Sequence, residues 1–265
     1  MKEKVSVVLP VLVGDDQFLI ALTEFCIKTM RLRTTLPYEL VLVETGTRHF
    51  ERLIHYDRGL CAYLHVDKYV HCPERTTVVK DHNTGLRAAS GDLLAFIGND
   101  VIVGTGWLEA LVEPFERYKD CGLSSVSAME PGANIGPAVP VPGLIVEGSY
   151  TPIMMFRRGW ELDEGYPGGY SDSDLIMRVY EAGLRAYRNC RAQVHHLNHL
   201  TIKGKGQAGR EEIAAGEARF YERWGGSPLM MYAVIRSGGV AYGREHEFLH
   251  RPIVPYMQRV PEGEV

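Results

Sequence analysis

Continuous apolar runs alternate with amphipathic segments along the first hundred residues of the chain. The runs at Val5–Leu9, Tyr38–Val43 and Leu93–Ile97 end at a proline, a glutamate and a glycine, respectively. Their length and apolar character are typical of strands buried on both faces. Between the first two runs, Asp16–Arg33 carries apolar side chains at every third or fourth position, which predicts a helix. Strands that alternate with helices indicate β-α-β units, so we expect an α/β fold with a mostly parallel central sheet flanked by helices.

The remaining elements are predicted from the same two periodicities. Helices are expected at Thr47–Leu60, Leu86–Ala89, Trp107–Tyr118, Ser173–Ala182 and Arg210–Trp224, and strands at Tyr63–Val70, Tyr150–Arg157 and Ala186–His195. The stretch Pro131–Gly148 is rich in proline and glycine and has no strong periodicity. This composition predicts a long surface loop or lid rather than a linker between domains.

Composition and charge exclude several classes of protein. Of the 265 residues, 45% are hydrophobic and 23% are charged, as in soluble globular chains. The net charge of −4 provides no basic footprint for a nucleic-acid backbone, and no apolar run approaches the roughly 18 residues of a transmembrane segment. The five cysteines are odd in number and form no Cys-x-x-Cys pair, which favours a reducing compartment and predicts a cytoplasmic location.

Polar and acidic residues follow several of the predicted strands. They form four groups: Asp15 and Asp16, Glu44, Asn99 and Asp100, and Asp172 and Asp174. Ligands of open α/β sheets bind beyond the carboxyl ends of the strands, where a carboxylate can accept from a nucleoside, hold a divalent metal or deprotonate a hydroxyl. The same residue types also cap helices. Capping does not explain Asp100, because the apolar Val101–Val103 follows it.

Two common nucleotide-binding classes lack their motifs here. A dinucleotide-binding fold places three glycines in its first β-α turn, whereas residues 10–16 of this chain contain one glycine and two aspartates. The chain also has no Gly-x-x-x-x-Gly-Lys-Ser/Thr sequence, which excludes a P-loop nucleotidase.

Six segments in a fixed order resemble the GT-A fold glycosyltransferases of family 2. They are Val7–Pro10, Glu39–Thr47, Asn83–Asp92, Phe96–Val101, Met155–Gly165 and Tyr170–Gly183. The resemblance runs from about Lys4 to Trp224. It implies one domain over residues 1–226, with a nucleotide-sugar half at 1–103 and an acceptor half at 104–226, followed by a C-terminal extension at 227–265.

The resemblance also implies roles for single residues. Glu44 matches the acid that binds the nucleoside, with Pro10 beside it, and the rest of the nucleotide-sugar cradle matches Asn83, Gly85, Asp92 and Asn99. Asp172 matches the catalytic base that precedes a helix. Asp100 matches the last acid of the Asp-x-Asp metal motif, in which Gly98 replaces the first acid.

A histidine after the last strand matches a further metal ligand of the family. Either His195 or His196 occupies this position, and neighbouring side chains of a strand point to opposite faces, so both cannot face one metal unless the strand has ended. The family pattern favours His196. The implied cofactor is a divalent metal, Mn²⁺ or Mg²⁺.

The implied activity is inverting transfer of a sugar from a nucleotide-diphosphate sugar to a hydroxyl of a glycan or another acceptor. Two alternatives remain open on the sequence. A sugar-phosphate nucleotidyltransferase also uses an α/β nucleotide site, although the first loop here is acidic. A catalytically inactive module that binds sugar nucleotides or glycans is suggested by Gly98 and by Ser171, which stands where the family commonly has glutamate.

Overall fold

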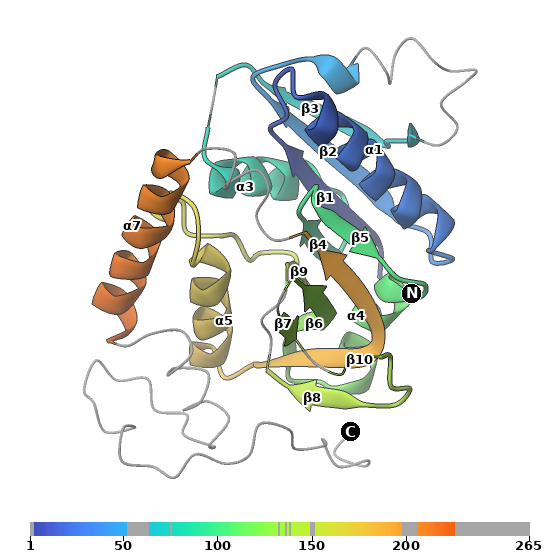
Figure 1. The fold of residues 1–265 in the computed structure, drawn as a ribbon. Coiled ribbons are helices and arrows are strands. Elements are labelled where there is room, and N and C mark those ends of the chain that lie inside the picture. Colours follow the sequence, from blue (N-terminus) through green and yellow to red (C-terminus); the bar gives the residue numbers. More distant parts are fainter. Residues whose placement is uncertain are drawn as a thin grey trace.

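The structure of the chain is a computed structural model, and it describes residues 3–51, 64–74, 76–131, 133–135, 137, 139–148, 152–197 and 206–225 (Figure 1). Its strands and helices follow in the order β1 (Val5–Val11), α1 (Gln17–Leu32), β2 (Glu39–Thr45), β3 (Lys68–Cys72), α3 (Val78–Ala88), β4 (Leu93–Ile97), β5 (Val101–Val103), α4 (Trp107–Arg117), β6 (Cys121–Glu130), β7 (Ala133–Ile135), β8 (Ile145–Glu147), β9 (Ile153–Arg157), α5 (Ser171–Glu181), β10 (Arg185–His196) and α7 (Gln207–Trp224).

The strands form one sheet in the order β3-β2-β1-β4-β9-β6-β10-β5. Strands β3, β2, β1 and β4 are parallel, whereas β9 is antiparallel to both of its neighbours, β4 and β6, and β10 runs parallel to β6. The predicted α/β sheet flanked by helices is therefore confirmed, with a parallel half and a mixed half. Because only β9 is reversed between β4 and β6, the carboxyl ends of β1, β4, β6 and β10 all lie at one edge.

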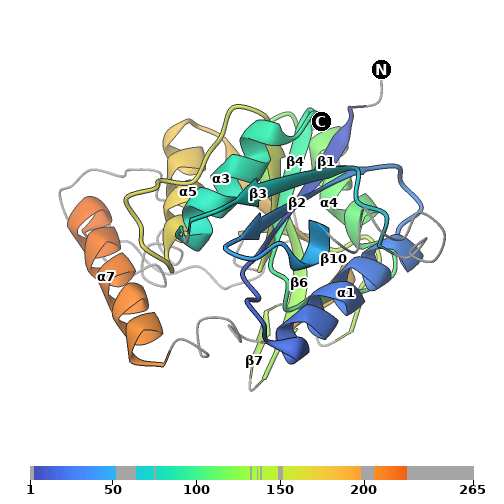
Figure 2. The ribbon, with the colours of Figure 1, turned by 90° about the horizontal axis from the view of Figure 1, so that it is seen from above.

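Helices cover both faces of the sheet with two apolar cores. One core joins α1 and α4 to the sheet, and the other joins α3, α5 and α7 to the opposite face. Figure 2 shows α1 and α3 on opposite sides of the strands. Side chains of β1 alternate between the cores, with Val7 and Leu9 in the first and Val8 in the second, as the period of a strand requires.

Several elements differ from the sequence-based expectation. Helix α3 begins at Val78, eight residues before the start of the predicted helix. It is capped by Thr77, whose side chain accepts a hydrogen bond from the backbone N–H of Lys80. Strand β6 was not predicted, because the buried serines 124, 125 and 127 interrupt its apolar pattern. The predicted lid contains β7 and β8. Most of the predicted helix at 47–60 and the whole extension at 227–265 lie outside the described residues.

Candidate active site

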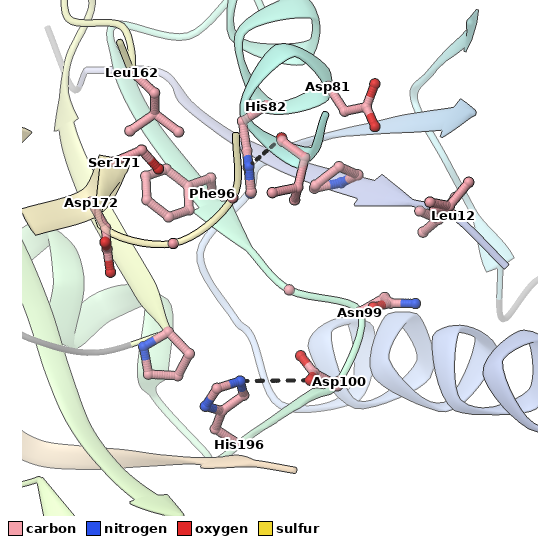
Figure 3. Close-up of a pocket in the computed structure, with 17 residues that line it drawn as sticks. Leu12, Asp81, His82, Phe96, Asn99, Asp100, Leu162, Ser171, Asp172 and His196 are labelled. Carbon is pink, nitrogen blue, oxygen red and sulfur yellow. Dashed lines mark hydrogen bonds and ion pairs between the residues drawn. The ribbon is translucent and has the colours of Figure 1, made fainter. Parts of the chain in front are cut away.

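A cavity opens at the edge where the parallel strands end (Figure 3). Its wall includes Pro10 and Val11 from β1 with Leu12 directly after it, Val78, Asp81 and His82 from α3, Gly98, Asn99 and Asp100 after β4, Gly168, Gly169, Ser171 and Asp172 around the start of α5, and His196 from β10. Segments far apart in the sequence thus meet at one site. The location agrees with the rule that ligands bind beyond the carboxyl ends of strands.

The structure brings Asp100 and His196 together at this edge. Both are nearly buried, and the Oδ2 atom of Asp100 lies 3.6 Å from the Nε2 atom of His196. A side chain at position 98 would begin 2.8 Å from the Oδ1 atom of Asp100, so the glycine leaves space for this carboxylate. His195 points to the other face of β10, where it is exposed and contributes nothing to the cavity wall. Of the two predicted histidines, only His196 faces Asp100.

A third acidic residue completes the surroundings of His196. The Nδ1 atom of His196 lies 2.7 Å from the Oε1 atom of Glu130, the last residue of β6. Burial disfavours the charged imidazolium, but the carboxylates of Asp100 and Glu130 outweigh this effect and raise the pKa of His196. No motif or periodicity singles out Glu130, because its partner lies 66 residues away on a neighbouring strand.

The Asp100–His196 pair has donor atoms suited to a divalent cation. Among the described residues, no three His, Cys, Asp or Glu side chains converge on a metal position. Two protein ligands are nevertheless compatible with Mg²⁺ or Mn²⁺, because such ions are commonly held by one or two side chains together with phosphate oxygens and water. We find that the residues present fit a cation that arrives with a diphosphate.

Asp172 lies in the first turn of α5 and borders the cavity. Its Oδ1 atom accepts from the backbone N–H of Ser173 at 2.8 Å. The helix begins at Ser171, so the N-cap is Tyr170, which has a left-handed φ of 73°. Asp172 is therefore not the N-cap, and it borders the cavity from the first turn of the helix.

The other acids near Asp172 are held in ion pairs. Asp174 is fully buried and pairs with Arg178 and Arg223, Asp163 pairs with Arg219 and Arg223, and Glu164 pairs with Arg87. None of these three carboxylates contributes to the cavity wall. Asp172 is thus the acid of this region that reaches the cavity.

Glu44 has no acceptor capacity left for a ligand. Its carboxylate is fully buried and receives hydrogen bonds on Oε1 from Thr47 (3.2 Å) and His49 N–H (2.7 Å), and on Oε2 from Phe50 N–H (3.0 Å) and the Tyr69 hydroxyl (2.7 Å). Four donors fill the roughly four lone-pair sites of a carboxylate. Glu44 is also absent from the cavity wall, so the structure gives it a role in holding β2, β3 and the turn after β2.

Asn83 and Gly85 lie inside α3 and serve packing. The side chain of Asn83 is fully buried and makes two hydrogen bonds with the backbone of Leu162, at 2.8 and 2.9 Å. A side chain at Gly85 would begin only 2.3 Å from Val8 and 2.8 Å from Val43, so glycine permits the close approach of α3 to the sheet. Neither residue belongs to the cavity wall.

The remaining predicted contacts divide between the two ends of β4. Asp92 precedes β4 and accepts from the backbone N–H of Lys4 at 2.9 Å, so the structure places it at the end of the strand away from the cavity. Asn99 and Pro10 do line the cavity. The side-chain amide of Asn99 donates to the hydroxyl of Thr23 at 3.0 Å.

Asp81 and His82 were missed by the sequence analysis because α3 itself was predicted too short. Asp81 is buried and accepts from the Thr76 hydroxyl. The Nδ1 atom of His82 lies 2.8 Å from the carbonyl oxygen of Val78 and forms a hydrogen bond with it. Burial lowers the pKa of His82 to about 4. It therefore contributes a neutral imidazole to the cavity, with the proton on Nδ1 because a carbonyl can only accept.

Solved structures share the fold of this chain. GalNAc-T7, solved with UDP, GalNAc and Mn²⁺, superposes with a TM-score of 0.57 at 15% sequence identity, and the match covers 75% of this chain and 44% of that one. The structure of S. aureus TarS 1–349 superposes with a TM-score of 0.56 at 12% identity, covering 83% of this chain and 72% of that one. This chain thus spans less than half the length of the GalNAc-T7 chain.

Sequence comparison identifies the family. No curated protein sequence matches the chain. None of the helices in the described ranges is long and apolar enough to cross a membrane. Residues 6–160, more than half of the 265 residues, match glycosyl transferase family 2. The chain therefore belongs to glycosyltransferase family 2.

Proposed function

We propose that this glycosyltransferase moves a sugar from a nucleoside-diphosphate sugar to an acceptor hydroxyl, with inversion and with the help of a divalent cation. The observation that carries the proposal is that Asp172 and the Asp100–His196 pair border one cavity from different elements (Figure 3). A base and a cation site on one cavity are the two functions that such a transfer needs.

The donor fits the cavity with its nucleoside beside β1 and α3. Figure 3 shows Leu12 and Asp81 together on the side of the cavity opposite Asp172. Since Glu44 is saturated by internal donors, we assign nucleoside recognition on this side to Asp81, whose carboxylate can accept from a ribose hydroxyl or a base N–H. The nucleoside diphosphate of the GalNAc-T7 complex is UDP, which makes UDP the first ligand to test here.

The diphosphate lies next to Asp100 and His196 in this arrangement. The described cavity wall contains the carboxylates of Asp81, Asp100 and Asp172 and no lysine or arginine. This wall would repel a bare diphosphate, which favours a donor that binds together with a cation held by Asp100 and His196. When bound, Mn²⁺ or Mg²⁺ acts as a Lewis acid that stabilises charge on the departing diphosphate.

Asp172 serves as the general base. Its carboxylate takes the proton of the acceptor hydroxyl while that oxygen bonds to the anomeric carbon on the face opposite the nucleotide. The bond from the anomeric carbon to the diphosphate oxygen breaks in the same displacement, and its electron pair leaves with the diphosphate. One displacement inverts the anomeric configuration.

Thermal denaturation with UDP, GDP and dTDP, each with and without Mn²⁺, tests this proposal. A ligand that binds only the folded state at 100 times its Kd adds about 2.7 kcal/mol of stability, so one of these diphosphates should raise Tm in a Mn²⁺-dependent way. Asp100→Ala should melt near the wild-type temperature alone and lose the Mn²⁺-dependent rise. Asp92→Ala, at the other end of β4, is the matched control and should keep it.

Two outcomes would contradict the proposal. If none of the diphosphates stabilises the wild type with Mn²⁺, the cavity is not a nucleotide site for these bases. If Asp100→Ala keeps the full Mn²⁺-dependent rise, Asp100 is not a cation ligand.

A further inference from the structure

Glu130 ends β6 directly beside the end of β10. The two strands are parallel, and their register pairs His195 with Met129, which brings the next residues, His196 and Glu130, to the same edge of the sheet. Both side chains are largely shielded from solvent, with exposed fractions of 7% for His196 and 17% for Glu130. Their contact of 2.7 Å between Nδ1 and Oε1 is short enough for a charge-assisted hydrogen bond.

This contact determines which nitrogen of His196 faces Asp100. A carboxylate can only accept, so the proton of a neutral imidazole lies on Nδ1 and the lone pair lies on Nε2. Nε2 is the atom that lies 3.6 Å from Asp100. Histidines that bind metals usually donate their other N–H to a carboxylate or carbonyl, which fixes the tautomer, orients the ring and raises its basicity.

We propose that Glu130 is a positioning residue that holds the Nε2 atom of His196 toward Asp100 and thereby sets the affinity of this pair for a divalent cation. The inference rests on the proposed function, because it assigns Glu130 a part in the cation site proposed there. It concerns a residue of β6 that neither touches the donor nor lines the cavity.

A purely structural role for Glu130 predicts a different result. In that case the pair only secures the ends of β6 and β10, and its loss would lower the free energy of unfolding without changing metal affinity. Glu147 provides a matched control for this role. It forms a 2.8 Å ion pair with Arg185, at the other end of β10, so Glu147→Ala removes a carboxylate partner of the same strand away from the cavity.

Calorimetric titration with Mn²⁺, with and without saturating UDP, separates the two roles and needs no acceptor or turnover. Wild type, His196→Ala, Glu130→Ala, Glu130→Gln and Glu147→Ala are compared, with circular dichroism as a check of folding. We expect Glu130→Ala to weaken Mn²⁺ binding about 10–100-fold, the range found for outer-shell partners of metal ligands. Glu130→Gln should lose less, because its amide oxygen can still accept from Nδ1, and Glu147→Ala should bind Mn²⁺ like the wild type.

The outcomes distinguish this inference from the proposed function. Suppose that the wild type binds Mn²⁺, that His196→Ala does not, and that Glu130→Ala binds Mn²⁺ as tightly as the wild type. The positioning role of Glu130 is then overturned, and the cation site stands. If wild type binds no Mn²⁺ in the presence of UDP, both fail. If Glu130→Ala does not fold, Glu130→Leu decides, because leucine fills much of the same space but accepts no hydrogen bond, and a Kd equal to that of the wild type would overturn the proposal.

Discussion

At the scale of residues, the family pattern assigns nucleoside binding to Glu44, whereas we propose Asp81 for this contact. Glu44 is buried beneath four donors, and Asp81 borders the cavity. In Glu44→Gln, whichever oxygen becomes the NH₂ faces a backbone N–H that can only donate, that of His49 at Oε1 or that of Phe50 at Oε2, and each unsatisfied buried donor costs about 1–3 kcal/mol. We therefore expect Glu44→Gln to lower the free energy of unfolding by at least about 1 kcal/mol, measured by urea denaturation, with little change in the Kd for UDP.

Asp81→Asn is the companion variant and should show the opposite pattern. Asparagine cannot provide two acceptor oxygens, so UDP binding measured by calorimetry with Mn²⁺ should weaken more than in Glu44→Gln. A variant Glu44→Gln with wild-type stability and strongly reduced UDP affinity would return the nucleoside contact to Glu44.

Four of the predicted site residues border the cavity, and each lies at the end of a strand or the start of a helix. Pro10 lies near the end of β1, Asn99 and Asp100 follow β4, and Asp172 lies in the first turn of α5. Glu130 could not be found in this way, because its place beside His196 depends on the register between β6 and β10. Asp92 lies at the end of β4 away from the cavity, because proximity to a strand in sequence does not say which end of the strand faces the cavity.

At the scale of elements, α7 supports the turn that carries Asp172. A side chain at Gly216 would begin 2.3 Å from the carbonyl oxygen of Gly169, so α7 touches the backbone just before α5. Alanine is the better helix former by up to about 1 kcal/mol, yet overpacking of this kind costs about 1–3 kcal/mol. We expect Gly216→Ala to lower Tm and the transfer rate while the Kd for UDP stays near that of the wild type.

Ala215→Leu is the control for this prediction, because Ala215 is exposed on the same helix. It should leave Tm and rate nearly unchanged. A Gly216→Ala variant more stable than the wild type and fully active would show that α7 does not press on the turn.

The elements with a clear period were predicted, and those fixed by long-range packing were not. The sequence pattern located α1, α4 and β4 to within about two residues, the usual uncertainty of such boundaries. The prediction started α3 too late. Its first turns carry buried polar residues, among them Asp81 and Asn83, and these weaken the apolar stripe by which a helix is recognised in the sequence. The reversed strand β9 was predicted as a strand, but its direction follows from the connections of the sheet rather than from its own sequence.

At the scale of the whole molecule, the sheet gathers the proposed base and the proposed cation ligands at one edge. Strands β4 and β10 carry Asp100 and His196 there, and α5 brings Asp172 to the same cavity. The sequence match places the chain in glycosyltransferase family 2, and the solved structures share its fold. The division of labour within the site is the central claim and depends most on Asp172.

The most direct test of this claim is proton NMR of sugar release from an α-linked nucleotide sugar, with water as the acceptor. The donor is the glucose or N-acetylglucosamine ester of the nucleoside diphosphate that stabilises the chain. We predict that wild type releases the β-anomer first and that Asp172→Asn slows release about 10²–10⁴-fold, with donor affinity and Tm unchanged. Initial release of the α-anomer, or an Asp172→Asn variant that keeps most of the wild-type rate, would contradict the account.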